Sequence, residues 1–381
     1  MKKTIMILTN SDSGLYDFRK EILKELIAEG YRVIVSVPAG NYQNRIEQLG
    51  CEYVATAVNR RGMNPIKDAF LLMNYLRMLR KYRPDVVLTY TVKPNTYGCI
   101  ACRILRIPFI VNITGLGTAL ENSGMVQRIV VMLYRIALKR ARCVFFQNEY
   151  NQKFIKDLGC IHGKTRLLPG SGVNITEHEY TPYPDEEKEI RILDVMRIMR
   201  AKGASELLTV APVIHTEFPR VIFEIAGSYE EESRAEYEPM IKDLQDRGIL
   251  RYYGYREDIQ KIMENSHIII NPSYSEGMSN VLLEAAATGR PVIATNINGC
   301  IEAFQDGITG ISCDAKNNES LLRALRKMLK KSADERALMG RDGRTYVKER
   351  FNREIVVSIY LEEIAAAIKD KQNSIRNKKR G

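Results

Sequence analysis

Two glutamates eight positions apart form the clearest chemical signal in the chain. Glu276 and Glu284 open and close the segment EGMSNVLLE, which follows the short apolar run HIIIN from His267. This pattern predicts a buried strand that ends at Asn271, a loop that carries Glu276, and a helix that begins near Ser279. At the carboxyl end of a strand, Glu276 is placed to accept hydrogen bonds from sugar hydroxyls, because an ionised carboxylate offers only acceptors.

Backbone N–H groups beside this loop add a second kind of chemistry. The first N–H groups of a helix lack intrahelical partners and attract negative charge. We therefore expect the backbone of Met278, Ser279 and Asn280 to complement an anion. Asn280, Glu284 and Thr288 also share one helix face, although the solvated side of an amphipathic helix explains that stripe equally well.

A basic pair provides a candidate clamp for a diphosphate. Arg197 and Lys202 lie in VMRIMRAKG, where a strand gives way to a helix. The arginine can bind phosphate as a fork and the lysine as a point charge, although two such residues alone are more often solvated charges on a turn. Gly14 follows the first apolar run and precedes a helix, so its backbone can also approach a phosphate. Its segment, NSDSGLYDFRKE, has neither GxGxxG nor a Walker lysine.

Short apolar runs alternate with helical patterns in two series. Strands with one solvent-exposed face alternate apolar and polar residues, whereas these runs are apolar throughout. They therefore predict parallel sheets covered by helices on both sides. The first series starts at Thr4, Val33, Asp85, Phe109 and Cys143. The second series starts at Ile190, Val221, Leu250, His267, Pro291 and Thr309. Ligands of such sheets bind beyond the carboxyl ends of the strands.

The segment between the two series predicts a domain boundary. Residues 174–189 are polar, acidic and rich in proline, as in a linker. We expect an amino-terminal domain at 1–173, a carboxyl-terminal domain at 190–351, a helix at about 352–370 that packs back on the first domain, and a basic tail at 371–381.

Length, composition and cysteines restrict the class of protein. The chain has 381 residues, of which 45% are hydrophobic and 27% charged, and Lys or Arg interrupts every long apolar run. These values favour a globular protein of two domains without a membrane-spanning helix. Seven scattered cysteines fit free thiols in a reducing cytoplasm, and the lone CxxC from Cys99 is more often core packing than zinc ligation.

Positive charge is concentrated in the first half of the chain. Residues 1–172 hold 26 basic and 12 acidic residues, a net charge of +14, against +11 for the whole chain. Two helical patterns there, 60–83 and 125–142, are basic and apolar, and they predict contact with an anionic membrane surface. The alternative for each helix alone is an apolar side that covers the sheet and a solvated basic side.

The excess of basic charge is also compatible with a nucleic-acid-binding protein. No zinc finger, helix-turn-helix or RNP-type aromatic strand is visible in the sequence, and the acidic second half would repel a phosphate backbone. We therefore expect no nucleic-acid partner. A non-catalytic subunit that binds a sugar nucleotide is the other alternative.

Taken together, these motifs resemble the retaining glycosyltransferases of family four from Met1 to about Lys369. The resemblance rests on the E-x7-E element of Glu276 and Glu284, the basic pair, and LPGSGVN from Leu168. It is closer to a bacterial subgroup that extends lipid-diphosphate-linked sugars, including N-acetylgalactosaminyl and capsule transferases. The segments that carry it are LYDFRKE from Leu15, RRGMNPIKD from Arg60, YTVKPNTYG from Tyr90 and NITGLGTA from Asn112.

The resemblance implies an α/β chain with the GT-B fold, in which two Rossmann-like, doubly wound, parallel-sheet domains face each other across a cleft. It implies a UDP-sugar donor, such as UDP-N-acetylgalactosamine or another UDP-hexose. It implies a polyprenyl-diphosphate-linked saccharide acceptor, from the synthesis of bacterial surface polysaccharide, capsule or glycoprotein glycan. Neither a cofactor nor a metal is implied, and the sequence has no DxD metal element in a matching place. The implied location is the cytoplasm, at the inner face of the cytoplasmic membrane.

Residue roles are implied in the same way. Glu276 resembles the carboxylate that meets the donor sugar, and Arg197 and Lys202 resemble the pair that neutralises the leaving diphosphate. Glu284 resembles the residue that holds the ribose, and Tyr255 belongs to a turn that resembles the loop beside the base. The backbone that approaches the sugar and β-phosphate runs through Gly277, Met278, Ser279 and Asn280.

One position departs from the family pattern. Many members have a histidine after the strand that corresponds to FIVNI from Phe109, whereas this chain has Thr114 and Gly115 there. We expect Thr114 to contact the donor sugar without taking part in a histidine-assisted mechanism. Retaining members use front-face attack assisted by the leaving phosphate, so no nucleophile is named.

Overall fold

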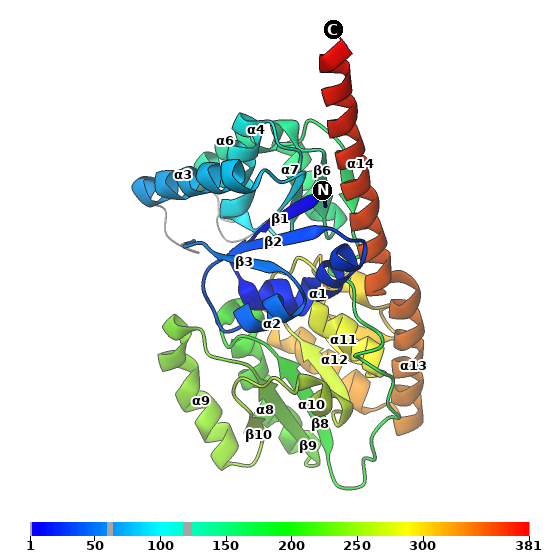
Figure 1. Ribbon diagram of the computed structural model, residues 1–381. Coiled ribbons are helices and arrows are strands. Elements are labelled where there is room, and N and C mark those ends of the chain that lie inside the picture. The colour runs from blue at the N-terminus through cyan, green and yellow to red at the C-terminus, as the bar shows by residue number, and fades with distance from the viewer. Residues whose placement is uncertain (1, 59–63, 117–123, 381) are drawn as a thin grey trace. The chain divides into compact units, whose positions relative to one another are not determined.

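The computed structural model describes residues 2–58, 64–116 and 124–380, with side chains described up to residue 373. The chain forms two compact units. Unit 1 comprises residues 1–171 and 353–381, and unit 2 comprises residues 172–352. Each unit is a parallel β-sheet covered by helices on both faces (Figure 1).

Unit 1 has a seven-stranded sheet in the order β3-β2-β1-β4-β5-β6-β7. Its strands are β1 (Thr4–Leu8), β2 (Arg32–Val37), β3 (Glu52–Ala55), β4 (Val86–Tyr90), β5 (Phe109–Ile113), β6 (Cys143–Phe146) and β7 (Thr165–Leu167). Its described helices are α1 (Asp12–Ala28), α2 (Gln43–Gln48), α3 (Pro65–Tyr82), α4 (Cys99–Leu105), α6 (Met125–Ala137), α7 (Glu149–Asp157) and α14 (Arg353–Arg380), with short helical turns η1 (Pro94–Gly98) and η2 (Leu138–Arg140).

Alternating side chains of β1 show why both faces of this sheet must be covered. Met6 and Leu8 belong to a buried cluster with α3, α4 and α6, whereas Ile5 and Ile7 belong to a second cluster with α1 and α14. A strand with period-2 side chains that are apolar on both faces requires a helix layer on each side. In Figure 1, α3, α4 and α6 lie above the strands of this sheet and α1 and α2 lie below them.

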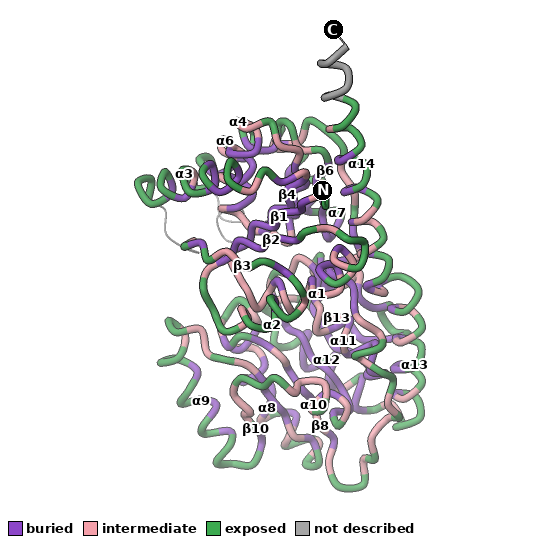
Figure 2. The backbone as a smooth tube through the Cα atoms, in the orientation of Figure 1, coloured by how far each residue is buried: buried purple, intermediate pink, exposed green. Residues whose placement is uncertain are grey.

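Unit 2 has a six-stranded sheet in the order β10-β9-β8-β11-β12-β13. Its strands are β8 (Ile190–Val195), β9 (Val221–Ala226), β10 (Leu250–Tyr252), β11 (Ile268–Asn271), β12 (Val292–Thr295) and β13 (Gly310–Cys313). Its helices are α8 (Ala204–Glu217), α9 (Arg234–Asp246), α10 (Ile259–Glu264), α11 (Asn280–Thr288), α12 (Asn318–Leu329) and α13 (Ala333–Arg350), with turns η3 (Arg200–Lys202), η4 (Glu231–Ser233) and η5 (Ile301–Ala303). The strands are buried and the outer sides of the helices are exposed (Figure 2).

The interpretation of 174–189 as a linker is wrong, because this segment is part of unit 2. The guanidinium of Arg290 is fully buried and donates to the backbone oxygen and the hydroxyl of Thr181 at 3.0 and 2.6 Å. Burial lowers the pKa of Arg290 to about 10. Arg336, also buried, forms an ion pair with Glu186. The polar and acidic residues of this segment therefore supply acceptors to buried arginines.

The chain passes between the units at 171/172 and again at 352/353. In unit 2 the two passing segments lie side by side, because Val173 forms a parallel bridge with Asn352 and its N–H donates to the oxygen of Phe351 at 2.8 Å. The second passage begins α14, which packs on the sheet of unit 1 through Val356 and Tyr360. The helix expected at about 352–370 runs on to Arg380, so residues 371–380, which were expected to form a basic tail, continue α14.

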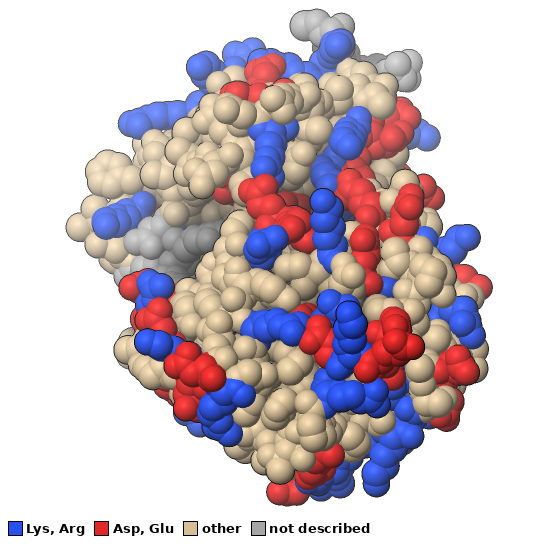
Figure 3. Space-filling model, turned by 90° about the horizontal axis from the view of Figure 1, so that it is seen from below, with Lys and Arg blue, Asp and Glu red and all other residues tan. Residues whose placement is uncertain are grey.

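Several charges of the second half of the chain form ion pairs. Exposed ion pairs join Arg326 to Glu217 and Arg251 to Glu189. On the face drawn in Figure 3, acidic and basic side chains are interspersed. Such exposed pairs contribute little to stability individually, but they show that the acidic excess of this half is not gathered in one place on that face.

Candidate functional site

Three loops of unit 2 meet at one edge of its sheet. Strands β8, β11 and β12 are neighbours and run parallel, so their carboxyl ends lie at the same edge. The loop after β8 carries Lys202, the loop after β11 carries Glu276, and the loop after β12 carries Gly299. Ligands of doubly wound sheets bind at this edge.

Lys202 and Glu276 form the centre of this site. The ammonium Nζ of Lys202 lies 2.5 Å from Oε1 of Glu276, and the hydroxyl of Ser273 donates to the same oxygen at 2.8 Å. The two charged side chains are 22% and 15% exposed, so the pair is mostly withdrawn from water but still open to a ligand. A cation and a carboxylate that meet at one point can serve an anionic leaving group and a hydroxylated sugar together.

Two glycines allow these loops to approach each other closely. Gly203 has φ +78, and a Cβ there would lie 2.3 Å from the backbone oxygen of Pro272. Gly299 has φ +86, and its Cβ would lie 2.6 Å from the backbone oxygen of Glu276. Only glycine fits these positions without displacing the backbone that carries Glu276.

A buried carboxyl lies beneath the pair and had no signal in the sequence. Asp194, near the end of β8, is 1% exposed, and its Oδ2 has no hydrogen-bond partner among the described residues. Burial raises the pKa of Asp194 well above its usual value; nearby Lys202 opposes the shift and Glu276 adds to it. This shift favours the neutral form of Asp194, and the carboxylate that contacts Lys202 is that of Glu276.

The beginning of α11 completes this site and corrects one expectation. The N–H of Ser279 is not free to meet a ligand, because it donates to the backbone oxygen of Gly299 at 2.7 Å. The side chain of Ser279 accepts from Asn271 at 2.9 Å and does not cap the helix. The side-chain oxygen of Asn280 is buried and has no partner among the described residues, so it is available to a ligand hydroxyl. The helix face that Asn280 shares with Thr288 is not simply the solvent-exposed side of the helix, because Thr288 is fully buried.

The hydrogen bond of Arg197 is made outside the Lys202–Glu276 pair. Its guanidinium donates to Glu230, in the loop after β9, at 2.8 Å, and its side chain is 60% exposed. The expected convergence of Arg197 and Lys202 on one diphosphate therefore requires Arg197 to exchange Glu230 for phosphate. Tyr255 is 63% exposed, and its turn is joined to the loop after β9 by the bond from the N–H of Gly227 to the oxygen of Gly254 at 2.8 Å.

The remaining expected donor contacts belong to unit 1. Gly14 lies in the first turn of α1, where its N–H donates to the hydroxyl of Ser11 at 3.1 Å. Thr114 and Gly115 follow β5, and the backbone oxygen of Thr114 lies 3.0 Å from the side-chain amide of Gln147. Because the strands of this sheet are parallel, these residues lie at its carboxyl edge.

Thr91 is a further unusual residue at that edge. It follows β4 with φ +71, a conformation that is strained for a β-branched residue, and its hydroxyl is buried without a partner among the described residues. Backbone strain of this kind gathers at ligand sites. No sequence pattern points to Thr91, because strain is a property of the folded backbone.

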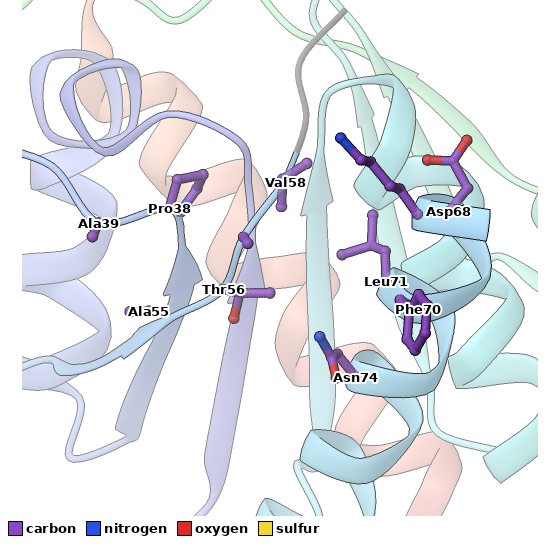
Figure 4. A pocket seen from close by; sticks show the side chains of 11 residues that line it. Pro38, Ala39, Ala55, Thr56, Val58, Asp68, Phe70, Leu71 and Asn74 are labelled. Carbon is purple, nitrogen blue, oxygen red and sulfur yellow. The ribbon is translucent and has the colours of Figure 1, made fainter. Parts of the chain in front are cut away.

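A cavity of about 830 Å³ opens beside the carboxyl ends of β2 and β3. Pro38, Ala55 and Thr56 line it from the strand side, and Phe70 and Asn74 face them from α3 (Figure 4). The size and the mainly apolar wall are those of a small-molecule site.

Three contacts hold the walls of this cavity to other loops at the carboxyl edge of the sheet. Asp68, which lines it, forms an ion pair with Lys93 at 2.6 Å and accepts from Tyr97 at 3.0 Å, so α3 is tied to the loop after β4. Asp12 accepts from the N–H of Tyr42 at 3.0 Å, so the loop after β2 is tied to the beginning of α1, next to Gly14.

Two family models and the fold identify a glycosyltransferase of GT-B architecture. Residues 178–346 match the family of glycosyl transferases group 1, and residues 14–170 match the glycosyl transferase 4-like domain. The chain therefore belongs to these glycosyltransferases, and its domains are those of family four.

Characterised relatives cover most of the chain. One is the N,N'-diacetylbacillosaminyl-diphospho-undecaprenol alpha-1,3-N-acetylgalactosaminyltransferase of Campylobacter jejuni, 27% identical, with 85% of this chain and 89% of that protein aligned. Another is the UDP-Gal:alpha-D-GlcNAc-diphosphoundecaprenol alpha-1,3-galactosyltransferase of Escherichia coli, 27% identical, with 77% and 78% aligned. HepE of Anabaena, solved with UDP and glucose, has a similar fold, with a TM-score of 0.78, 17% identity and alignment over 96% of this chain and 100% of that one.

Glu284 provides a test of the nucleotide end of the site. It lies on α11, one turn after Asn280. If it holds the ribose, Glu284→Ala should weaken UDP binding by about tenfold, because a hydrogen bond to a charged group contributes roughly 1.5–3 kcal/mol. Calorimetry with UDP measures this, and unchanged affinity would contradict the role. Glu349→Ala, which removes an exposed carboxylate on α13 of the same unit, is the control and should bind UDP normally.

Proposed function

We propose that the protein is a retaining, metal-independent glycosyltransferase that moves a sugar from a UDP-sugar to a polyprenyl-diphosphate-linked saccharide. The observation that carries the proposal is the contact of Lys202 with Glu276 at the edge of unit 2 where α11 begins. UDP in the HepE structure and diphospho-undecaprenol in the names of two relatives support the choice of donor and acceptor. The pathway is the synthesis of a bacterial surface polysaccharide, capsule or glycoprotein glycan.

The donor binds by replacing the internal partners of the cations. The β-phosphate replaces Glu276 as the partner of the Lys202 ammonium. The carboxylate of Glu276 then accepts hydrogen bonds from the sugar hydroxyls. Arg197 leaves Glu230 for the same diphosphate, and the open N–H groups of α11 add to the positive potential. Glu276, Arg197 and Lys202 are therefore the catalytic residues of this proposal.

Transfer with retention follows from this arrangement. The bond from the anomeric carbon to the β-phosphate oxygen breaks, and its electron pair stays on that oxygen. The hydroxyl oxygen of the acceptor bonds to the anomeric carbon on the same face, and its proton passes to the departing phosphate oxygen. Lys202 and Arg197 stabilise the charge that develops on the diphosphate, which is the role that a metal has in other enzymes.

The experiment that tests the activity combines a panel of UDP-sugars with polyprenyl-diphosphate-linked saccharides. We expect one donor and acceptor pair to release UDP and lengthen the lipid-linked saccharide. We also expect EDTA to leave the rate largely unchanged. Loss of activity with EDTA and its recovery with a divalent ion would contradict the metal-independent part, and UDP release without a lengthened acceptor would contradict the transfer.

The cavity beside β2, β3 and α3 is the proposed acceptor site. Phe70 and Leu71 offer apolar surface to a sugar ring, whereas Asn74 and Asp68 offer polar groups and Lys67 a cation. Phe70 is also 65% exposed and forms an exposed apolar stripe on α3 with Ile66 and Met73, which are 68% and 45% exposed. A lipid-linked saccharide can therefore place its sugar in the cavity while its chain follows this stripe.

Filling the cavity tests this placement. Ala57 lines it and is exposed, so Ala57→Trp adds bulk inside the cavity without disturbing the core. We expect the acceptor KM to rise by about tenfold or more while UDP affinity stays unchanged, because the indole occupies the place of the sugar. Ala69→Trp, on α3 but outside the cavity lining, is the matched control and should behave as wild type. An unchanged acceptor KM in the Ala57 variant would contradict the assignment.

Peripheral membrane contact is the remaining part of the proposal. On α6, Met125, Ile129, Met132 and Ile136 form an exposed apolar stripe at helical spacing. Stripes of this kind beside basic residues bind anionic lipid surfaces. No helix in the described part of the chain is long and apolar enough to cross a membrane. The proposed location is the cytoplasmic face of the inner membrane.

A further inference from the structure

Unit 1 has a second cavity, at the opposite edge of its sheet from Thr114. It measures about 570 Å³ and is lined at the amino ends of β5 and β6 by Ile107, Pro108 and Ala141. β5 has five residues, which span about 16 Å at roughly 3.3 Å per residue. The cavity is therefore separate from the proposed donor and acceptor sites.

Basic side chains from several segments surround this cavity, and no Asp or Glu lines it. They are Arg103, Arg106, Lys139, Arg140, Arg142 and Lys371. Arg103 and Arg106 come from the end of α4, the next three from η2 and the residues after it, and Lys371 from α14. His162 adds a further nitrogen donor from the loop before β7.

Some of these cations are occupied by protein acceptors and others are not. Arg142 forms an ion pair with Asp370 at 2.9 Å, and Lys371 lies 3.5 Å from Asp85. The side chains of Arg106, Lys139 and Arg140, by contrast, have no hydrogen bond or ion pair within the described part of the chain. The cavity therefore keeps an excess of positive charge for a ligand.

Arg103 gives a second sign of a missing acceptor. One of its terminal nitrogens donates to the backbone oxygen of Ile136, which ties α4 to α6. Its Nε is buried and has no partner among the described residues. A buried guanidinium donor that is left unpaired costs free energy, which an anionic oxygen at this place would recover.

Exposed apolar side chains on α4 and α6 favour a lipid as the source of the anion. Ile104 on α4 is 56% exposed, and Ile136 and Met132 on α6 are 45% and 55% exposed. A soluble anion needs no such neighbours, whereas a phospholipid brings acyl chains that bury them. Basic pockets of this kind bind lipid phosphate groups.

We propose that this cavity binds the phosphate of an anionic phospholipid and so holds unit 1 on the membrane. The inference rests on the proposed function, since a lipid-linked acceptor requires the enzyme at a bilayer. The contact has a defined place on the molecule: the phosphate enters among Arg106, Lys139 and Arg140, and the acyl chains lie against Ile104 and the stripe of α6.

Two charge-matched triple variants of the full chain test the proposal by vesicle flotation. One combines Arg106→Ala, Lys139→Ala and Arg140→Ala, and the other combines Arg77→Ala, Arg80→Ala and Lys81→Ala on α3. The second set is equally exposed and lies outside the cavity lining. We expect the cavity variant to lose roughly 100-fold in binding to phosphatidylcholine vesicles that contain phosphatidylglycerol, and the α3 variant to lose clearly less.

Free pyrophosphate separates a phosphate pocket from diffuse attraction. It should displace wild type and the α3 variant from these vesicles more than sodium chloride of the same ionic strength does, and the cavity variant should lose this difference. Equal losses in both variants, or equal effects of both salts on wild type, would overturn the proposal. If wild type binds no vesicles but binds pyrophosphate more tightly than the cavity variant does, the cavity is a site for a soluble anion, which would also overturn the proposal.

Sugar transfer in detergent separates this inference from the proposed function. The cavity variant should transfer sugar to a detergent-solubilised lipid-linked saccharide at the wild-type rate, because its substitutions lie at the opposite edge from the proposed acceptor site. If wild type itself transfers no sugar to any lipid-linked saccharide, the proposed function fails independently of the vesicle results.

Discussion

Lys202→Ala is expected to slow sugar transfer by more than tenfold and by up to about 100-fold, with the fold retained. The ammonium of Lys202 is the one cation in contact with Glu276 among the described residues, and the proposed diphosphate takes its place beside that carboxylate. Losing one charged hydrogen bond to a leaving group costs roughly 1.5–3 kcal/mol of transition-state stabilisation. Steady-state rates with saturating acceptor, together with a thermal melt, measure both parts.

Two companion variants sharpen this test. Arg200→Ala removes a cation from the same turn but leaves the contact with Glu276 intact, so it should transfer sugar at nearly the wild-type rate. Arg197→Ala should slow transfer by more than tenfold, since the same diphosphate is its proposed partner. Nearly normal turnover in both Lys202→Ala and Arg197→Ala would remove the diphosphate clamp from the account.

Glu276→Gln is expected to lower kcat by more than tenfold while UDP affinity changes little. Glutamine keeps the size of the side chain but loses the charge that Lys202 and the sugar hydroxyls meet, and only interactions with the reacting sugar lower kcat selectively. UDP lacks that sugar, so calorimetry with UDP separates the two effects. A kcat equal to that of wild type would contradict contact between Glu276 and the donor sugar.

Glu302→Gln is the control for this variant. Glu302 lies in the neighbouring loop, where its carboxylate accepts from the N–H of Gly299 at 2.6 Å, and an amide oxygen can accept the same bond. We expect its kcat to stay close to that of wild type. A fall as large as that of Glu276→Gln would mean that any charge change in these loops disturbs the site.

Much of the fold follows directly from the sequence. Every apolar run in the two series forms a strand, and all of these strands except the edge strand β10 are mostly buried, because a strand covered on both faces must be apolar throughout. Two strands of unit 1 were missed. β3 reads EYVA and β7 reads TRL, and both lie at or near the edges of the sheet, where burial is incomplete and the apolar signal is weak.

Amino-acid composition alone does not locate the boundary of the second unit. Residues 174–189 have the proline and acidic content of a linker, yet they complete unit 2 by satisfying Arg290 and Arg336. The sequence does not reveal this contact, since Thr181 and Arg290 are 109 positions apart. Only the folded chain shows that a polar segment is needed by a buried cation.

The candidate site was predictable to the extent that its residues lie in local motifs. Glu276, Lys202 and the start of α11 each belong to a short pattern, and the sheet brings the first two into contact. Asp194 and Thr91 carry no pattern, because burial of a carboxyl and strain of a backbone arise only from packing. The roles of all these residues in transfer remain predictions.

The anomeric configuration of the transferred sugar tests the central claim most directly. Wild type is incubated with its α-linked UDP-sugar and a polyprenyl-diphosphate-linked saccharide, and NMR of the product measures the coupling at the new anomeric carbon. Front-face attack assisted by the leaving phosphate at the Lys202 and Glu276 site predicts an α linkage, formed in step with UDP release. A β linkage, or no linkage to any lipid-linked saccharide with any UDP-sugar, would contradict the account.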